Sequence, residues 1–187
     1  MRISGGAQRG RRLRSPGGRG TRPTSALLRQ AVLNVLAAQI PDARVLDLFA
    51  GTGAVGLEAL SRGAAHVTFV EREPHALASL RQNLASLALG DRASVVGGDV
   101  VACLPRLEEA GARFDVIFVD PPYESDLAGR CIEVLAPGHL LRDNALLIVQ
   151  AFHKTLLPER AGVLSQRWRR RYGESSLSLY TRGSPCS

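Results

Sequence analysis

The chain has 187 residues, of which 45% are hydrophobic and 22% are charged, a composition typical of one soluble globular domain. Its formal net charge is +7. No apolar run approaches the roughly 18 residues of a membrane span, and no apolar segment follows the first residues, so we expect a cytoplasmic protein without a membrane partner.

The positive charge is concentrated near the N-terminus. Residues 1–41 contain eight arginines and no acid, whereas residues 42–187 contain 16 basic and 17 acidic residues. A basic segment on a nearly neutral domain is typical of a protein that binds nucleic acid, with a solvated tail as the alternative. We therefore expect a basic, nucleic-acid-binding arm at residues 1–24 and a folded domain at residues 25–187.

The cysteines and histidines do not cluster. Cys103, Cys131 and Cys186 form no C-x-x-C pair, and the four histidines are scattered along the chain. This spacing argues against a disulfide framework and against a metal site. Cys103 and Cys131 lie in helical patterns and are interpreted as small core residues.

Strands and helices are predicted to alternate along most of the chain. A hairpin near residues 9–13 precedes a helix that begins near Thr24 or Ser25 and ends before Pro41. Apolar runs predict strands at residues 45–49, 67–70, 93–96, 114–119 and 145–149, with helices at 56–62, 74–89, 101–110 and 126–135. Segments 167–172 and 176–180 follow as a hairpin. The pattern predicts one α/β domain, doubly wound and Rossmann-like, whose mostly parallel sheet ends in a C-terminal antiparallel hairpin.

Residues typical of ligand sites follow four of these strands at their carboxyl ends, where doubly wound sheets bind ligands. Gly51 and Gly53 belong to a G-x-G-x-x-G pattern after the first strand. Glu71 follows the second strand, where a carboxylate can accept two hydrogen bonds from a ribose diol. Asp99 follows the third strand, and Asp120-Pro121-Pro122-Tyr123 follows the fourth.

The glycine pattern alone also fits an NAD-dependent dehydrogenase. Asp47 argues against that function, because it lies four residues before Gly51 and would bring negative charge near a pyrophosphate. Its carboxylate instead suits a ligand that carries positive charge. The chain also lacks a hydride-transfer set such as Tyr-x-x-x-Lys, since Lys154 is its only lysine.

Two segments resemble motifs of class I S-adenosylmethionine-dependent methyltransferases. Asp47-Leu48-Phe49-Ala50-Gly51-Thr52-Gly53 resembles their first motif, and Asp120-Pro121-Pro122-Tyr123 resembles the fourth motif of those that methylate exocyclic or amide nitrogens. An exocyclic amine is a poor nucleophile because its lone pair is conjugated with the ring. The Asp120 carboxylate and the Pro121 carbonyl can accept hydrogen bonds from the NH2 group and favour its tetrahedral form. Pro122 helps to hold the backbone extended, and Tyr123 can stack on a flipped base.

Most of the chain, from residue 1 to about 182, resembles the bacterial 16S ribosomal RNA guanine-N2 methyltransferases of RsmD type. The arm distinguishes this family, because the glycine loop is common to all class I methyltransferases. Ser25-Ala26 and Arg29-Gln30 depart from the usual Thr-Asp-x-x-Arg-Glu, so two acids are missing, while the catalytic motif is intact. The matching segments are Arg2-Ile3, Gly5-Gly6, Arg9-Gly10-Arg11, Arg22-Pro23-Thr24, residues 56–63 and Tyr172-Gly173.

The resemblance implies methylation of one guanine N2 in 16S rRNA, in an assembling or assembled small subunit, with S-adenosylmethionine as cofactor and no metal. We expect the enzyme to be a monomer. The implied catalytic residues are Asp120, Pro121, Pro122 and Tyr123. The implied cofactor residues are Asp47, Gly51, Gly53, Glu71 (at the ribose), Asp99 and Val100 (near the adenine). The arginines implied to bind rRNA phosphates are Arg9, Arg11, Arg12 and Arg22.

Three other functions share some of these features. A DNA or RNA adenine-N6 methyltransferase shares the Asp-Pro-Pro-Tyr motif, but DNA enzymes usually carry a target-recognition insertion that is missing after the fourth strand. A protein glutamine methyltransferase would be expected to have Asn at position 120. A non-catalytic RNA-binding module would explain the arm and leave the motifs at the strand ends unexplained.

Overall fold

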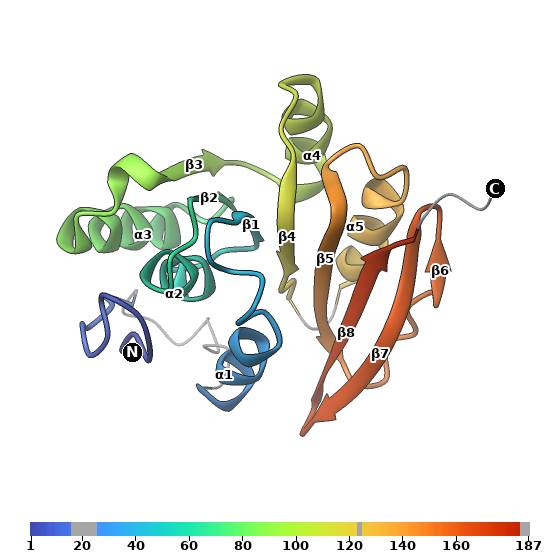
Figure 1. Cartoon of the computed structure of the whole chain (residues 1–187), viewed down its shortest axis with the longest axis horizontal. Helices are drawn as coiled ribbons and strands as arrows, with labels where there is room; N and C mark the ends of the chain where they lie inside the picture. The colour runs from blue at the N-terminus through green and yellow to red at the C-terminus, as the bar shows by residue number, and fades with distance from the viewer. Residues whose placement is uncertain (16–25, 123–124, 184–187) are drawn as a thin grey trace.

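A computed structural model describes residues 1–15, 26–122 and 125–183, which are built around one eight-stranded sheet (Figure 1). The strand order is β3-β2-β1-β4-β5-β8-β7-β6. The first five strands along the chain pair in parallel, whereas β8, β7 and β6 extend the sheet in antiparallel pairs. This confirms the predicted mostly parallel sheet with a C-terminal antiparallel hairpin. The strands are β1 (Arg44–Leu48), β2 (His66–Glu71), β3 (Ala93–Gly97), β4 (Phe114–Val119), β5 (Leu141–Phe152), β6 (Arg160–Ala161), β7 (Leu164–Tyr172) and β8 (Ser175–Arg182).

Helices cover both faces of the sheet, as expected for strands that are apolar on both sides. Residues of α1, α2 and α3 belong to one hydrophobic cluster, and residues of α4 and α5 belong to a second cluster on the other face. In β1, Val45 contributes to the first cluster and Leu46 to the second, in keeping with the alternation of side chains along a strand. The helices are α1 (Ala26–Val35), α2 (Ala54–Ser61), α3 (Pro74–Leu87), the 3-10 helix η1 (Gly90–Arg92), α4 (Val100–Glu109) and α5 (Leu127–Leu135).

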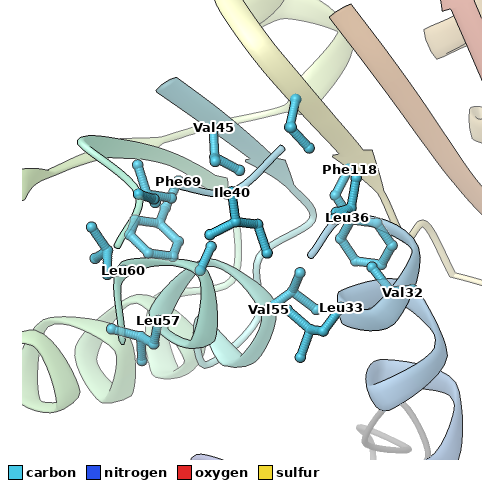
Figure 2. Packing of buried hydrophobic residues seen from close by; sticks show 14 of the residues in the cluster. Val32, Leu33, Leu36, Ile40, Val45, Val55, Leu57, Leu60, Phe69 and Phe118 are labelled. Carbon is cyan, nitrogen blue, oxygen red and sulfur yellow. The ribbon is translucent and has the colours of Figure 1, made fainter. Parts of the chain in front are cut away.

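The first cluster joins α1 and α2 to the middle of the sheet (Figure 2). Val32 and Leu33 of α1 lie near Val55 of α2 in this view, and Phe69 and Phe118 come from the strands above them. All five side chains are at most 5% exposed. Their burial fixes α2, and therefore the loop that precedes it, against the middle of the sheet.

Residues 1–15 form a hairpin that packs on the same face of the sheet. Arg2 bridges to Arg12 in antiparallel fashion, and the side chains of Ile3 and Leu13 are buried in the first cluster. The sequence analysis placed a hairpin near residues 9–13. That boundary was wrong, because the pairing partner of the second strand lies at Arg2.

Other boundaries also differ from those predicted. β5 extends beyond residues 145–149 because Leu141 pairs with β4 and Phe152 pairs with β8. α1 ends at Val35 and continues as a turn before Pro41. β6 was not predicted, since two residues give no periodic signal. The predicted start of α1 at Thr24 or Ser25 lies outside the described residues.

Across the part of the chain that the structure describes, no helix is long and apolar enough to cross a bilayer. Cys103 and Cys131 are buried in the second cluster, as predicted for small core residues. Cys186 lies outside the described residues.

Candidate active site

The order of the strands reverses between β1 and β4, and this is where doubly wound sheets bind ligands. The two strands are parallel neighbours, with Leu48 beside Val119 in register. The backbone N–H of Asp120 donates to the Leu48 carbonyl at 3.4 Å. The glycine loop after β1 and the Asp120 motif after β4 therefore leave the sheet side by side.

Left-handed backbone conformations turn the chain sharply between β1 and α2. Phe49, Gly51 and Gly53 have φ angles of 61°, 56° and 81°. A Cβ on Gly53 would lie 2.3 Å from the Cδ1 atom of Leu80, so any side chain there would displace this buried leucine of α3. A Cβ on Gly51 would meet no heavy atom within 4 Å, which places an open surface on that part of the loop.

Asp47 lies inside the protein, below this loop. Its side chain is almost fully buried, and its Oδ2 atom accepts a hydrogen bond from the Gly56 N–H at 2.9 Å. Burial raises the pKa of Asp47 to about 7; the Gly56 N–H opposes the shift, and the charges of Asp120 and Glu71 add to it. Asp47 therefore connects the first turn of α2 to β1. The negative charges of Asp120 and Glu71 raise its pKa further.

Glu71 connects the loops that follow β1 and β2. Its Oε2 atom accepts the Gly51 N–H at 2.7 Å, and its Oε1 atom accepts the N–H groups of Arg72 and Glu73, each at 2.8 Å. A carboxylate offers about four acceptor positions, so about one remains. The sequence analysis expected this carboxylate to accept two hydrogen bonds from a ribose diol. Three backbone N–H groups of the protein already occupy most of its acceptor positions.

Asp99 lies at the next strand end and caps α4. Its Oδ1 atom accepts the Ala102 N–H at 3.2 Å, and its Oδ2 atom lies 3.8 Å from the guanidinium of Arg72. Asp99 is exposed, whereas the adjacent Val100 is buried. This loop is also joined to β2, because the Gly98 N–H donates to the Glu71 carbonyl at 2.9 Å.

The fourth motif begins with a half-buried Asp120, followed by a buried Pro121 and an exposed Pro122. The Pro122 carbonyl accepts the Ser125 hydroxyl at 2.6 Å. Tyr123 lies outside the described residues. The edge that these loops form is acidic, since Glu71, Asp99 and Asp120 lie at the ends of β2, β3 and β4, with Asp47 buried below them.

The arginines predicted to bind RNA are exposed where the structure describes them, at Arg9, Arg11 and Arg12. The Arg11 guanidinium also donates to the Ser86 carbonyl at 2.7 Å, on α3. Arg22 lies outside the described residues. Among the residues described, no group of three or more His, Cys, Asp or Glu side chains could hold a metal ion.

The sequence analysis missed Asn83, which connects the hairpin to the glycine loop. Its side chain is fully buried; Oδ1 accepts the Arg14 N–H at 2.7 Å, and Nδ2 donates to the carbonyls of Arg14 and Thr52, each at 3.1 Å. A signal was present in the sequence. Position 83 falls between Leu80 and Leu84 on the apolar face of α3, where a polar residue requires a partner.

Comparison with known proteins assigns the family. The family model described as Conserved hypothetical protein 95 matches residues 1–181. Ribosomal RNA small subunit methyltransferase D of Escherichia coli K12 is 38% identical over 182 residues, which cover 97% of this chain and 90% of that protein. The Haemophilus influenzae protein of the same name is 36% identical over 151 residues, or 80% of this chain and 78% of its own.

The chain belongs to the RsmD family. Solved structures agree with this assignment. The Escherichia coli protein yhhF superposes with a TM-score of 0.86 at 38% identity, and the match covers 98% of each chain. A Thermus thermophilus protein gives a TM-score of 0.81 at 37% identity, over 96% of this chain and 98% of its own. The resemblance to RsmD-type proteins and the predicted Rossmann-like fold are confirmed.

Proposed function

We propose that this member of the RsmD family transfers a methyl group from S-adenosylmethionine to the exocyclic N2 of a guanine in 16S rRNA. The observation that carries the proposal is the Asp120-Pro121-Pro122 segment beside the glycine loop, at the point where the strand order reverses. The name of the Escherichia coli relative, ribosomal RNA small subunit methyltransferase D, supports the substrate. We propose that the chain acts as a monomer on an assembling or assembled small subunit.

The residues at this edge fit the cofactor. The open side of Gly51 leaves room for a ligand against the backbone, and Glu71 keeps about one acceptor position for a ribose hydroxyl. Asp99 and Val100 lie one strand end farther along, where the adenine is expected. When bound, S-adenosylmethionine supplies an electrophilic methyl group on a positively charged sulfonium, and an acidic edge favours that charge.

Asp47 holds the loop rather than the ligand in this arrangement. Its carboxylate is buried and accepts the Gly56 N–H, so it fixes the first turn of α2, which directly follows the glycine loop.

Asp120 and Pro121 would act on the amine that is methylated. The Asp120 carboxylate and the Pro121 carbonyl accept hydrogen bonds from its N–H groups and draw its lone pair out of conjugation. Pro122 limits the freedom of the backbone at this point, and Tyr123 would stack on the flipped guanine. Catalysis is then mainly positioning and electrostatics, and the proton leaves the nitrogen after the methyl group has been transferred.

The arm would bring the rRNA to this edge. Arg9, Arg11 and Arg12 are exposed on the hairpin, and Arg22 follows in the sequence. Guanidinium groups bind phosphates in bidentate fashion, and such contacts supply the salt-dependent part of RNA affinity.

Nucleoside mass spectrometry tests the proposal. Small-subunit particles that lack the modification are incubated with S-adenosylmethionine and with the wild type, Asp120→Ala or Asp143→Asn. Asp143 is a matched control, because its side chain is 92% exposed at the opposite end of β5. We expect N2-methylguanosine from the wild type and Asp143→Asn only. Production of N6-methyladenosine instead would favour the adenine alternative, and no methylation by the wild type would refute the substrate.

A further inference from the structure

The nearly neutral domain contains a second basic region that the overall charge conceals. Residues 153–182 contain seven basic and two acidic residues, a net charge of +5, whereas residues 42–152 have a net charge of −6. The basic residues come from the loop after β5, from β6 and from the β7–β8 hairpin. The domain therefore combines an acidic part, residues 42–152, with a basic part, residues 153–182.

Strand register places part of this basic region, Arg169 to Arg171 at the end of β7, at the edge that carries Asp120. Arg160 and Arg182 lie toward the opposite end of these strands. Val119 pairs with Val149 of β5, Val149 with Ser178 of β8, and Ser178 with Arg169 of β7. One residue farther toward the site, the same register aligns Asp120 after β4 with Gln150 of β5, Leu177 of β8 and Arg170 of β7. Asp120 and Arg170 are therefore at the two ends of one row of residues across four strands. Strands are about 4.8 Å apart, so the two backbones are about 14 Å apart.

Arg170 also lies on the same face of the sheet as the N-terminal hairpin. It pairs with Leu177, which belongs to the cluster that contains Ile3 and Leu13 of the hairpin. In Figure 1, α1 lies between this hairpin and the β7–β8 turn, on the lower side of the view toward which β4 points. A strand of RNA that crosses the end of β4 can therefore reach both basic regions.

The side chains at this end of β7 are suited to unpaired nucleotides. The exposed Arg170 guanidinium lies over the half-buried Trp168 ring, 4.8 Å from the ring centroid. This contact holds the planar guanidinium in place, and its outer side can stack on a base while its N–H groups reach a phosphate.

Neighbouring contacts make the region a defined surface. The half-buried Arg169 donates to the carbonyls of His153 and Thr155, at 2.9 and 2.8 Å, and so fixes the loop that carries the exposed Lys154. Glu174 is the acid at this end; it lies 3.9 Å from Arg171 and 3.8 Å from His153. Arg170 and Lys154 are therefore the better candidates for contacts with phosphate.

We propose that Lys154, Trp168 and Arg170 form a second RNA-binding surface, which holds single-stranded nucleotides next to the guanine that is methylated. This inference rests on the proposed function, because it takes RNA as the substrate of the site. The N-terminal hairpin and this surface then hold the RNA on two sides of the acidic edge.

Binding to protein-free 16S rRNA tests the surface. Affinity is measured between about 50 and 200 mM salt for the wild type, Arg170→Gln, Arg170→Lys, Lys154→Gln and Arg113→Gln. Arg113→Gln is a matched control, because this exposed arginine precedes β4 at the opposite edge of the sheet. We expect Arg170→Gln to weaken binding roughly tenfold and to reduce the salt slope by about one unit. Arg170→Lys keeps the charge without the planar stack, so it should retain the slope and still lose affinity.

Lys154→Gln tests the same surface even if Arg170→Gln alters folding, because Lys154 lies on the loop after β5 and not in β7. The surface is refuted if both glutamine variants bind like Arg113→Gln. Weaker binding to intact small-subunit particles alone, with unchanged binding to protein-free rRNA, would identify a ribosomal protein as the partner and would also refute it. Methylation by the wild type is measured in parallel. Weaker RNA binding without any methylated guanine would refute the proposed function and leave the surface intact.

Discussion

Asn83 of α3 donates a hydrogen bond from Nδ2 to the carbonyl of Thr52, in the middle of the glycine loop. The same carboxamide binds both backbone polar groups of Arg14, where the hairpin ends. The RNA-binding arm and the cofactor loop of the proposed enzyme therefore share one fully buried side chain.

Asn83→Ala should destabilise the protein and weaken two binding reactions together. The variant leaves the Arg14 N–H and the Thr52 carbonyl without this partner, which costs about 2–3 kcal/mol in the free energy of unfolding. Urea unfolding measures that cost, and titration calorimetry measures the affinities for S-adenosylhomocysteine and for rRNA. Asn34→Ala, at an exposed position of α1, is the control. If only stability changes, Asn83 does not connect the two binding sites.

The two glycines of the loop should respond differently to alanine. Gly53→Ala combines a φ angle of 81° with a Cβ that would lie 2.3 Å from Leu80, so we expect a loss of about 3 kcal/mol in stability. Gly51→Ala has open space around its Cβ and should cost only about 1 kcal/mol. It should nevertheless weaken binding of S-adenosylhomocysteine more than tenfold, because the methyl group would occupy the ligand side of the loop. Wild-type affinity in a folded Gly51→Ala protein would contradict this placement of the cofactor.

Asp47 should make the protein less stable as the pH rises. The pKa of its carboxyl group rises from 3.8 to about 7 on folding, so the folded state binds more protons than the unfolded state between these values. The free energy of unfolding therefore decreases from about pH 4 to about pH 7, by up to about 4 kcal/mol from this group. Asp47→Asn keeps an acceptor for the Gly56 N–H and cannot ionise. Urea unfolding from about pH 5 to pH 8 should give a flatter curve for the variant, and parallel curves would disprove the shift.

The exposed arm arginines should contribute salt-dependent RNA affinity without contributing much to stability. Arg9→Gln and Arg12→Gln should each reduce the salt slope of rRNA binding by about one unit, with the thermal midpoint unchanged. Point substitutions are required, because deletion of the arm would also remove Ile3 and Leu13 from the core. Equal slopes for both variants and the wild type would exclude phosphate contacts at these positions.

The sequence predicted the elements whose signals are local. Alternating apolar strands, glycines at the turn after β1 and the Asp-Pro-Pro motif after β4 all depend on neighbouring residues, and the structure has these elements in the predicted order. The Asn83 contacts, by contrast, join residues 31 and 69 positions apart. Such pairings depend on how helices pack, which periodicity does not specify.

The charge of the domain shows a similar limit of sequence reasoning. The net charge of residues 42–187 is nearly zero, as counted from the sequence. That sum conceals an acidic part, residues 42–152, and a basic part, residues 153–182. Only strand register shows that Arg170 and Asp120 belong to one row of the sheet. Counting charge over shorter windows would have found the basic segment, although not its position beside the site.

The attachment of the hairpin has a consequence for the order in which the protein is made. Ser4 binds Glu58 across 54 residues, and Arg14 binds Asn83 across 69. A ribosome that synthesises this chain releases the arginine-rich segment well before α2 and α3, onto which it folds. Until those helices have been synthesised, the positively charged arm lacks the surface of α2 and α3 on which it packs. The hairpin arginines therefore reach their final positions only after the first half of the domain, which carries the glycine loop, has been made.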